Sequence, residues 1–111
     1  MKNIRKILFV CTGNTCRSNM AEALFRDILR KDPRAHHLDI KIQSAGTGAV
    51  ADLSSAPLAV EVLKDKGIDL SSHRTRALSP DMVERAGLIF TMSKQHRDEV
   101  LRMAPLAEDK V

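Results

Sequence analysis

The fold of this chain is decided by residues 7–18, which read ILFVCTGNTCRS. Four apolar residues, Ile7 to Val10, form a continuous run that is typical of a strand buried on both faces of a parallel sheet. A polar loop begins at Cys11, and a helical period starts at Ser18. In such sheets, ligands bind beyond the carboxyl ends of the strands, at the loop that runs into the next helix. The segment therefore predicts both a sheet and the position of a site.

Helical and extended patterns alternate along the rest of the chain. A helix is predicted from Ser18 to about Asp32, because apolar residues recur there as one stripe and a proline follows. A second, less buried strand is predicted around residues 40–42, before a turn over residues 44–48. The predicted stripe consists of Met20, Leu24 and Ile28, with Ala21, Phe25 and Leu29 beside it.

Three further helices and a third strand complete the pattern. Ser55 is predicted as the N-cap of a short helix that stops at Gly67, and Ser79 opens another brief helix. Residues 88–90 read as a strand, and Ser93 as the cap of a helix that runs to about residue 103. The order βαβα(α)βα predicts an α/β fold with three αβα layers and a parallel sheet, in one domain over residues 1–111.

The composition is typical of a soluble globular protein rather than of a disordered or a membrane protein. Hydrophobic residues make up 43% and charged residues 29% of the 111 residues, and no apolar run approaches the roughly 20 residues that span a bilayer. We expect a cytoplasmic protein with no membrane partner. The formal net charge of +4 favours anionic partners, but scattered basic residues and scarce aromatic residues argue against nucleic acid. No metal site is expected, with His36, His37 and His96 read as surface residues.

Loop residues 11–18 combine a thiol, an arginine and hydroxyls in the pattern of an anion cradle. A loop that enters a helix N-terminus turns several backbone N–H groups toward one point, where the helix dipole favours negative charge. Arg17 adds a planar fork for two phosphate oxygens, Gly13 eases the turn, and Asn14 tolerates a left-handed backbone. A thiol in this field ionises readily, and Ser18 can donate a hydrogen bond to it. The alternative is that Cys11 only ends a buried strand.

Residues 7–25, ILFVCTGNTCRSNMAEALF, resemble the opening of the low-molecular-weight protein tyrosine phosphatases, whose active-site loop is C-x5-R-S. Further similarity lies at residues 44–47, 67–74 and 88–92, with His96 after them. The resemblance implies a cysteine-dependent phosphatase with that family's fold, which needs no cofactor and acts on phosphorylated proteins. Cys11 would be the nucleophile and Arg17 its partner. The phosphate would be held by Thr12, Gly13, Asn14, Thr15, Cys16, Arg17 and Ser18.

The same resemblance assigns supporting, specificity and redox roles. Residues equivalent to Asn14, Ser18, Ser44 and His73 form the hydrogen-bond network that fixes the family's loop. Thr15 is found in the bacterial branch that acts on protein phosphoarginine, where classical members carry an aliphatic residue. Phosphoarginine is therefore the first substrate hypothesis, with phosphotyrosine as the alternative. Cys16 is a candidate redox partner, because a second thiol beside a reactive one can form a protective disulfide.

The sequence also departs from the family pattern. Asn19 replaces the proline that follows the loop serine, and Gly87 replaces an acidic residue before the third strand. Lys110-Val111 reads as the beginning of a fourth strand, so the chain is expected to lack the last strand, the last helix and the Asp-Pro loop with the family's general acid. The general acid is therefore unknown and the activity is expected to be impaired. An uncovered sheet edge would invite self-association.

Two functions from other classes stay open. An arsenate reductase-like thiol oxidoreductase would use the same oxyanion loop, although such enzymes usually carry resolving cysteines further along, and this chain has none after Cys16. An inactive phosphate-binding fragment would hold phosphorylated proteins without turnover. Trapping a phosphocysteine separates an enzyme from such a binding module.

Overall fold

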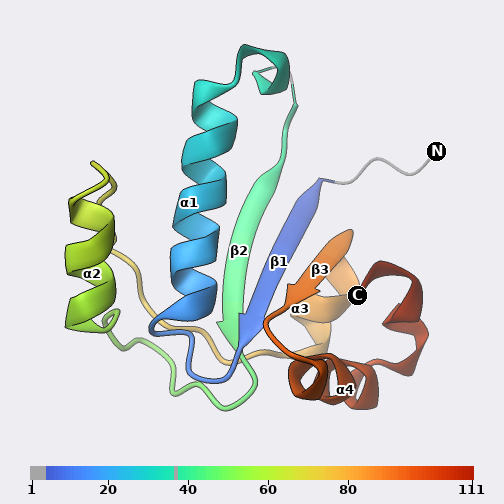
Figure 1. The fold of residues 1–111 in the computed structure, drawn as a ribbon. Coiled ribbons are helices and arrows are strands. Elements are labelled where there is room, and N and C mark those ends of the chain that lie inside the picture. Colours follow the sequence, from blue (N-terminus) through green and yellow to red (C-terminus); the bar gives the residue numbers. More distant parts are fainter. Residues whose placement is uncertain (1–4, 37) are drawn as a thin grey trace.

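The computed structural model describes residues 5–36 and 38–111, so the prediction for His37 lies outside the described residues. Its centre is a parallel sheet in the order β2-β1-β3 (Figure 1). The strands are β1 (Lys6–Cys11), β2 (Lys41–Gly46) and β3 (Leu88–Thr91). In the register of β1 with β2, Cys11 lies opposite Gly46. The predicted first and third strands are confirmed.

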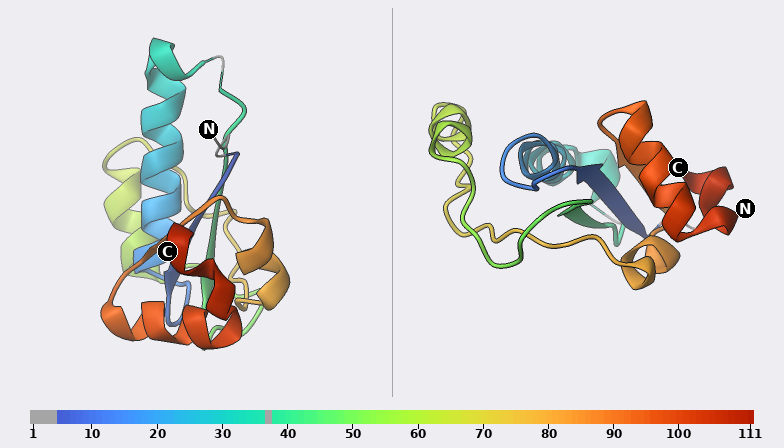
Figure 2. Two further views of the ribbon diagram at one scale, coloured as in Figure 1. Left: turned by 90° about the vertical axis from the view of Figure 1, so that its right-hand side faces the viewer. Right: turned by 90° about the horizontal axis from the view of Figure 1, so that it is seen from below.

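Helices cover both faces of the sheet, as Figures 1 and 2 show. On one side lie α1 (Arg17–Lys31) and α2 (Pro57–Lys64), and on the other α3 (Pro80–Arg85) and α4 (Lys94–Met103). Short 3-10 helices span Pro33–Ala35 (η1) and Pro105–Lys110 (η2). Alternate β1 side chains enter opposite layers: Phe9 packs with the α1 side, while Leu8 packs with α3 and α4. The predicted three-layer αβα fold is confirmed.

Helix starts follow local capping signals in two of the predicted cases. The Ser79 side chain accepts from the backbone N–H of Met82 at 3.3 Å, and that of Ser93 accepts from the N–H of His96 at 3.2 Å. Each bond satisfies an N–H group that the first helical turn leaves without a backbone partner. Gly67, with φ of 76°, follows α2 in the left-handed conformation that suits glycine.

The prediction of one apolar stripe on α1 is wrong. Met20 and Leu24 pack toward α2, whereas Phe25 and Leu29 pack against the sheet. Ile28 is 60% exposed. Between the two apolar edges runs a buried polar line, made of Ser18, Asn19 and Glu22. The side of α1 that faces the site is therefore polar.

Three other predicted details are wrong for tertiary reasons. Ser55 does not cap α2, which begins after Ala56; its buried hydroxyl instead accepts from the Asn19 side chain at 2.6 Å. The second strand continues through Gly46, and its last three residues are buried. Lys110 lies in η2 rather than in a strand, and its ammonium donates to the carbonyls of residues 84 and 86.

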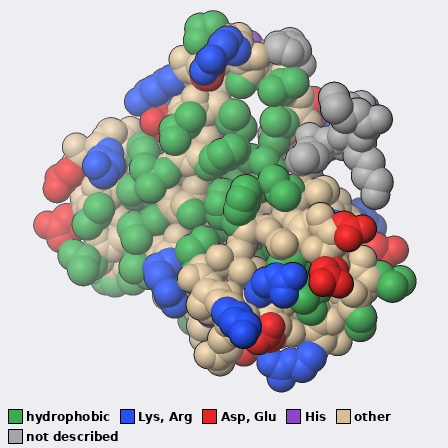
Figure 3. All heavy atoms as spheres, turned by 45° about the vertical axis from the view of Figure 1, so that its right-hand side comes forward, with side chains coloured by type: hydrophobic (Ala, Val, Ile, Leu, Met, Phe, Trp, Pro, Cys, Tyr) green, Lys and Arg blue, Asp and Glu red, His purple; other side chains and the backbone are tan. Residues whose placement is uncertain are grey.

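The outer edge of β3 is unpaired within residues 5–36 and 38–111, because this strand pairs only with β1. Phe90 on this strand is 44% exposed, and hydrophobic side chains gather over the middle of the face in Figure 3. Self-association through this edge stays a prediction. None of the helices in the described part of the chain has the length and apolar character to cross a bilayer.

Gly46 sets how closely β2 approaches the loop after β1. Its N–H donates to the Arg76 carbonyl and its carbonyl accepts from Leu78, each at 2.9 Å. A Cβ on Gly46 would overlap the Thr12 carbonyl oxygen and lie 2.8 Å from the Ala49 Cβ. Only a residue without a side chain fits there.

We therefore expect Gly46→Ala to lower the free energy of unfolding by about 1–3 kcal/mol, the usual cost of overpacking, or more. Gly48→Ala is the matched control. Its Cβ would meet the Thr12 Cγ2 at an ordinary 3.6 Å, so its effect should stay within about 0.5 kcal/mol. Urea unfolding measures both. Equal stabilities for the two variants would contradict this account of Gly46.

Candidate active site

The loop after β1 lies where the carboxyl ends of all three strands point (Figure 1). Cys11 is the last residue of β1, and Arg17 is the first residue of α1. Residues 12–16 therefore connect a buried strand to the N-terminus of a 15-residue helix. The first turn of α1 contains no acidic residue, so nothing there offsets the positive end of the helix dipole.

The Cys11 thiol is buried and has two polar neighbours. Its Sγ lies 2.9 Å from the Ser18 Oγ and accepts from the Asn14 N–H at 3.3 Å. The residue as a whole is 4% exposed. The sulfur is thus positioned by one group of the loop and one group of α1.

Asn14, rather than Gly13, carries the strained backbone of the loop. Asn14 has φ of 59°, in the left-handed region, as expected from its sequence. Gly13 does not have a positive φ, and a Cβ there would meet only the Thr15 Oγ1, at 3.5 Å. The prediction that the turn depends on a glycine at position 13 is therefore wrong. The close approach that requires a glycine occurs at Gly46 instead.

The Asn14 side chain is fully buried and joins three segments of the chain. Its Nδ2 donates to the Ser18 Oγ at 2.8 Å and to the Ser44 Oγ at 2.9 Å. Its Oδ1 accepts from the Arg76 N–H at 2.9 Å. Both amide hydrogens and the carbonyl of this side chain are therefore used. The structure brings together the residues that the resemblance named as loop supports.

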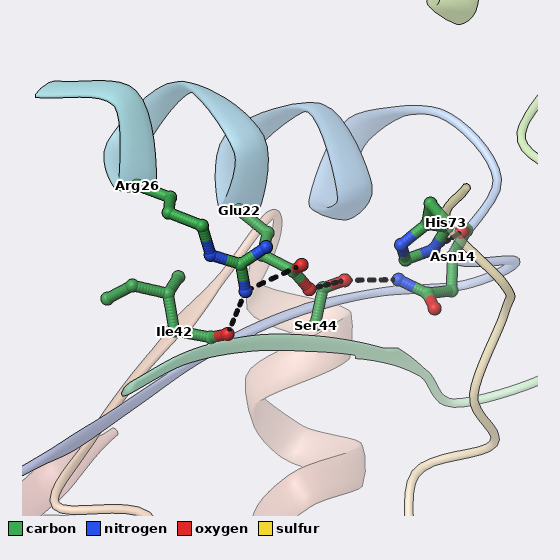
Figure 4. A network of polar contacts seen from close by, with 6 residues as sticks. All are labelled: Asn14, Glu22, Arg26, Ile42, Ser44 and His73. Atoms are coloured by element: carbon green, nitrogen blue, oxygen red, sulfur yellow. Dashed lines mark hydrogen bonds and ion pairs between the residues drawn. The ribbon is translucent and has the colours of Figure 1, made fainter. Parts of the chain in front are cut away.

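A buried carboxylate extends this network along α1 (Figure 4). Ser44 donates to Glu22 at 2.7 Å, and Glu22 pairs with Arg26 at 3.1 Å. Arg26 also donates to the Ile42 carbonyl at 2.6 Å. Glu22 was not among the residues predicted for the site. Its spacing was the available signal, because Ser18, Glu22 and Arg26 are four residues apart and share one helix face.

His73 approaches the loop from the segment before α3 (Figure 4). Its Nε2 lies 3.3 Å from the Asn14 carbonyl oxygen, which only accepts, so this nitrogen carries the proton. Burial lowers the pKa of His73 below its ordinary 6.5, against the opposing charge of Glu22 and the hydrogen bond to Asn14. A neutral ring is the form that this half-buried position favours.

His96 is not the surface residue that its charged neighbours indicated. It is 4% exposed, and its Nε2 lies 2.8 Å from the Oγ1 of Thr12. Its Nδ1 lies 2.9 Å from the Ser93 Oγ. The exposed position predicted for His36 is confirmed.

The remaining loop residues divide between solvent and core. Arg17 and Thr12 are exposed, and Thr15 is half-exposed. Cys16 is half-buried and packs with the apolar cluster between α1 and α2. Both cysteines are free thiols, and the redox role of Cys16 stays a prediction. Within residues 5–36 and 38–111, no group of three His, Cys, Asp or Glu side chains is placed to hold a metal.

The loop, its buried thiol and the helix that follows have the arrangement expected of a cysteine-based phosphatase. Residues 6–111 match the family described as low molecular weight phosphotyrosine protein phosphatase. The chain belongs to this family.

Relatives with different substrate names are equally similar to it. The chain is 40% identical over 105 residues to a protein-arginine-phosphatase of Bacillus subtilis, covering 95% of this chain and 67% of that protein. It is also 40% identical over 102 residues to a probable low molecular weight protein-tyrosine-phosphatase, EpsP, of Ralstonia nicotianae, covering 92% of this chain and 65% of that protein. It thus spans about two thirds of the length of these curated relatives.

A solved structure links the fold to a phosphorylated active site. The structure of a YwlE arginine phosphatase mutant with a phosphorylated active-site serine superposes with a TM-score of 0.86 at 39% identity. The match covers 96% of this chain and 66% of that one. Phosphorylation is thus recorded in the active site of a protein with this fold.

Replacing Asn14 should separate its backbone strain from its hydrogen bonds. Asn14→Ala removes three side-chain bonds and leaves a Cβ at positive φ, so we expect a loss of about 2–5 kcal/mol in the free energy of unfolding. Asn14→Gly removes the same bonds without the strain and should recover about 1–2 kcal/mol of that loss. Urea unfolding measures both. Full stability in Asn14→Gly would show that the hydrogen bonds contribute nothing.

The lowered pKa of His73 predicts how stability depends on pH. In the unfolded chain a histidine takes up its proton near pH 6.5, whereas folded His73 does so at lower pH. The unfolded state therefore binds more protons in this window, and the free energy of unfolding falls as the pH drops below about 6.5. His73→Gln should make this fall shallower than in the unaltered chain. His36→Gln, at an exposed histidine, is the matched control, and its fall should be steeper than that of His73→Gln. Urea unfolding between pH 7.5 and 5 tests this, and identical slopes would contradict it.

Proposed function

We propose that this chain is a phosphoprotein phosphatase that works through a cysteinyl-phosphate on Cys11, with protein phosphoarginine as its first substrate. One observation carries the proposal. A buried thiol, which accepts from the Asn14 N–H and lies 2.9 Å from the Ser18 hydroxyl, sits beside the N-terminus of a helix whose first turn has no carboxylate. This arrangement places a nucleophilic atom next to a helix end that favours an anionic ligand.

The geometry supports a two-step transfer. The Cys11 sulfur attacks phosphorus, a sulfur–phosphorus bond forms, and the bond from phosphorus to the substrate nitrogen or oxygen breaks. The leaving group departs with its electron pair and takes up a proton from solvent. Water then attacks phosphorus and gives a proton to solvent, the sulfur–phosphorus bond breaks, and phosphate and the thiolate are released. The Ser18 hydroxyl, 2.9 Å from the sulfur, is placed to donate to the departing thiolate.

The loop supplies the charge stabilisation that this transfer needs. The three equatorial oxygens of the phosphoryl group would be held by the loop N–H groups and by the guanidinium of Arg17. Arg17 lies on the first turn of α1 and is exposed, so its side chain is free to reach a bound anion. The Asn14 network holds the loop in shape before substrate arrives, which limits reorganisation during the reaction.

Thr15 supports phosphoarginine over phosphotyrosine. Thr15 is half-exposed. Its Oγ1 would lie 3.5 Å from a Cβ placed on Gly13, so the hydroxyl faces the side of Gly13 that carries no side chain. A threonine hydroxyl can hydrogen-bond a guanidinium, which an aliphatic side chain cannot do. The name of the B. subtilis relative agrees with this substrate.

Protein phosphotyrosine is the second candidate. The name of the equally similar R. nicotianae relative favours it, as does the description of the family. The two substrates use the same phosphoryl chemistry and differ only in the leaving group. Thr15 is therefore the position at which the two proposals can be separated.

Phosphate release from matched phosphoarginine and phosphotyrosine peptides tests the proposal. We expect release that depends on Cys11 and favours phosphoarginine, and Thr15→Ile should shift the ratio of the two kcat/KM values toward phosphotyrosine by about tenfold, the value of one hydrogen bond to a charged group. Thr15→Ser, which keeps the hydroxyl, is the matched control and should keep the ratio.

Two results would count against the proposal in different ways. Release that is unchanged in Cys11→Ser would remove the cysteine mechanism altogether. Cys11-dependent release with the same substrate ratio in the Thr15→Ile and Thr15→Ser variants would keep the mechanism and remove the role of Thr15.

A further inference from the structure

Three side chains form a row from the start of α4 to the residue beside the nucleophile. Ser93, the N-cap of α4, lies 2.9 Å from Nδ1 of His96, and Nε2 of His96 lies 2.8 Å from the Thr12 Oγ1. Thr12 directly follows Cys11. The row therefore connects the segment after β3 to the loop after β1, across 84 positions of sequence.

Burial fixes the partners of the imidazole. His96 is 4% exposed, so its ring nitrogens bond to protein groups rather than to water. A neutral imidazole has one donor and one acceptor nitrogen. The row can therefore be arranged in two ways, with all protons pointing toward Thr12 or all pointing toward Ser93.

The two arrangements differ in what the Thr12 hydroxyl can do. When Ser93 donates to Nδ1, Nε2–H donates to Thr12, and the Thr12 hydroxyl proton is free for another acceptor. In the other arrangement, the Thr12 hydroxyl donates to Nε2, and Nδ1–H donates to Ser93. Ser93 already accepts from the backbone N–H of His96 at 3.2 Å, which leaves its own hydroxyl proton free for Nδ1.

Thr12 is the residue next to Cys11 and begins the loop that runs to α1. Its residue is exposed, and its backbone is held, because its carbonyl accepts from the Gly48 N–H at 3.0 Å. Among the described residues, His96 is the hydrogen-bond partner of its hydroxyl. An anion in the loop would favour the arrangement in which this hydroxyl donates, since a negative charge strengthens the bond.

We propose that His96 is a positioning residue, which makes the Thr12 hydroxyl a hydrogen-bond donor to the phosphoryl group in the Cys11 loop. The inference rests on the proposed function and extends it to a residue on α4. In this arrangement Ser93 donates to Nδ1 of His96, and Nε2–H of His96 donates to the Thr12 Oγ1. The Thr12 hydroxyl then donates to the ligand. His96 itself contacts neither substrate nor sulfur.

Binding of inorganic phosphate measures this role without turnover. Phosphate in the loop shields Cys11 from iodoacetamide, so the phosphate dependence of the alkylation rate gives its Kd, with modification followed at Cys11 by tandem mass spectrometry. We expect Thr12→Val to raise this Kd about tenfold, the cost of one hydrogen bond to a charged group. Thr12→Ser, which keeps the hydroxyl, should stay near the unaltered chain.

Variants of His96 then test the coupling. His96→Leu should raise the Kd as much as Thr12→Val does, and His96→Gln, which restores a donor near the position of Nε2, should recover most of the loss. The double variant Thr12→Val/His96→Leu should bind no more weakly than either single variant. His36→Leu, an exposed histidine on another segment, serves as the matched control.

The outcomes separate this inference from the function on which it rests. A fully additive double variant, or His96→Leu with the Kd of the unaltered chain, would overturn the positioning role while phosphate still protects Cys11. If phosphate fails to protect Cys11 in the unaltered chain, the proposed function fails and the inference falls with it. Equally weak binding in His96→Gln and His96→Leu, with no recovery in the glutamine variant, would also overturn it.

Discussion

The site depends on one buried amide. Asn14 is fully buried with φ of 59°, and its side chain bonds to Ser18, to Ser44 and to the Arg76 backbone. Its own N–H meanwhile donates to the Cys11 sulfur. A left-handed residue in a loop costs about 1–2 kcal/mol and persists only where its surroundings impose that conformation. The three side-chain bonds impose it here. The same residue therefore has the strained backbone, connects the loop to its neighbours and donates a hydrogen bond to the Cys11 sulfur.

Segments that are far apart in the sequence meet around this amide. β1 provides the thiol, α1 provides Ser18 and Glu22, β2 provides Ser44, and the segment before α3 provides His73. Losing one partner of a buried polar group lowers the free energy of unfolding. Since the same hydrogen bonds hold the loop, the stability of the fold and the shape of the site depend on one network. A change in any of these segments should disturb both. The loop is thus preorganised by the fold, as an oxyanion cradle requires.

Local signals predicted the elements, and long-range contacts decided the exceptions. The apolar run of β1 and the serine caps of α3 and α4 were readable, because each acts within a few residues. Ser55 failed as a cap, since Asn19 on another helix takes its hydroxyl. His96 was read as exposed because its partner Thr12 lies 84 positions away. A glycine is required at position 46 rather than at position 13, because the end of β2 approaches the loop too closely for a side chain. The resemblance to the family predicted that Ser44 and His73 belong to the site, which their spacing in the sequence could not predict.

We propose that Cys11, held in this loop, accepts a phosphoryl group. Rapid mixing with a phosphoarginine peptide, followed by an acid quench and intact-mass spectrometry, would detect the phosphorylated enzyme. We expect a species heavier by one phosphoryl group, which tandem fragmentation places on Cys11 and which is missing in Cys11→Ala. Peptide dephosphorylation without any such species, or with the phosphoryl group on another residue, would contradict it.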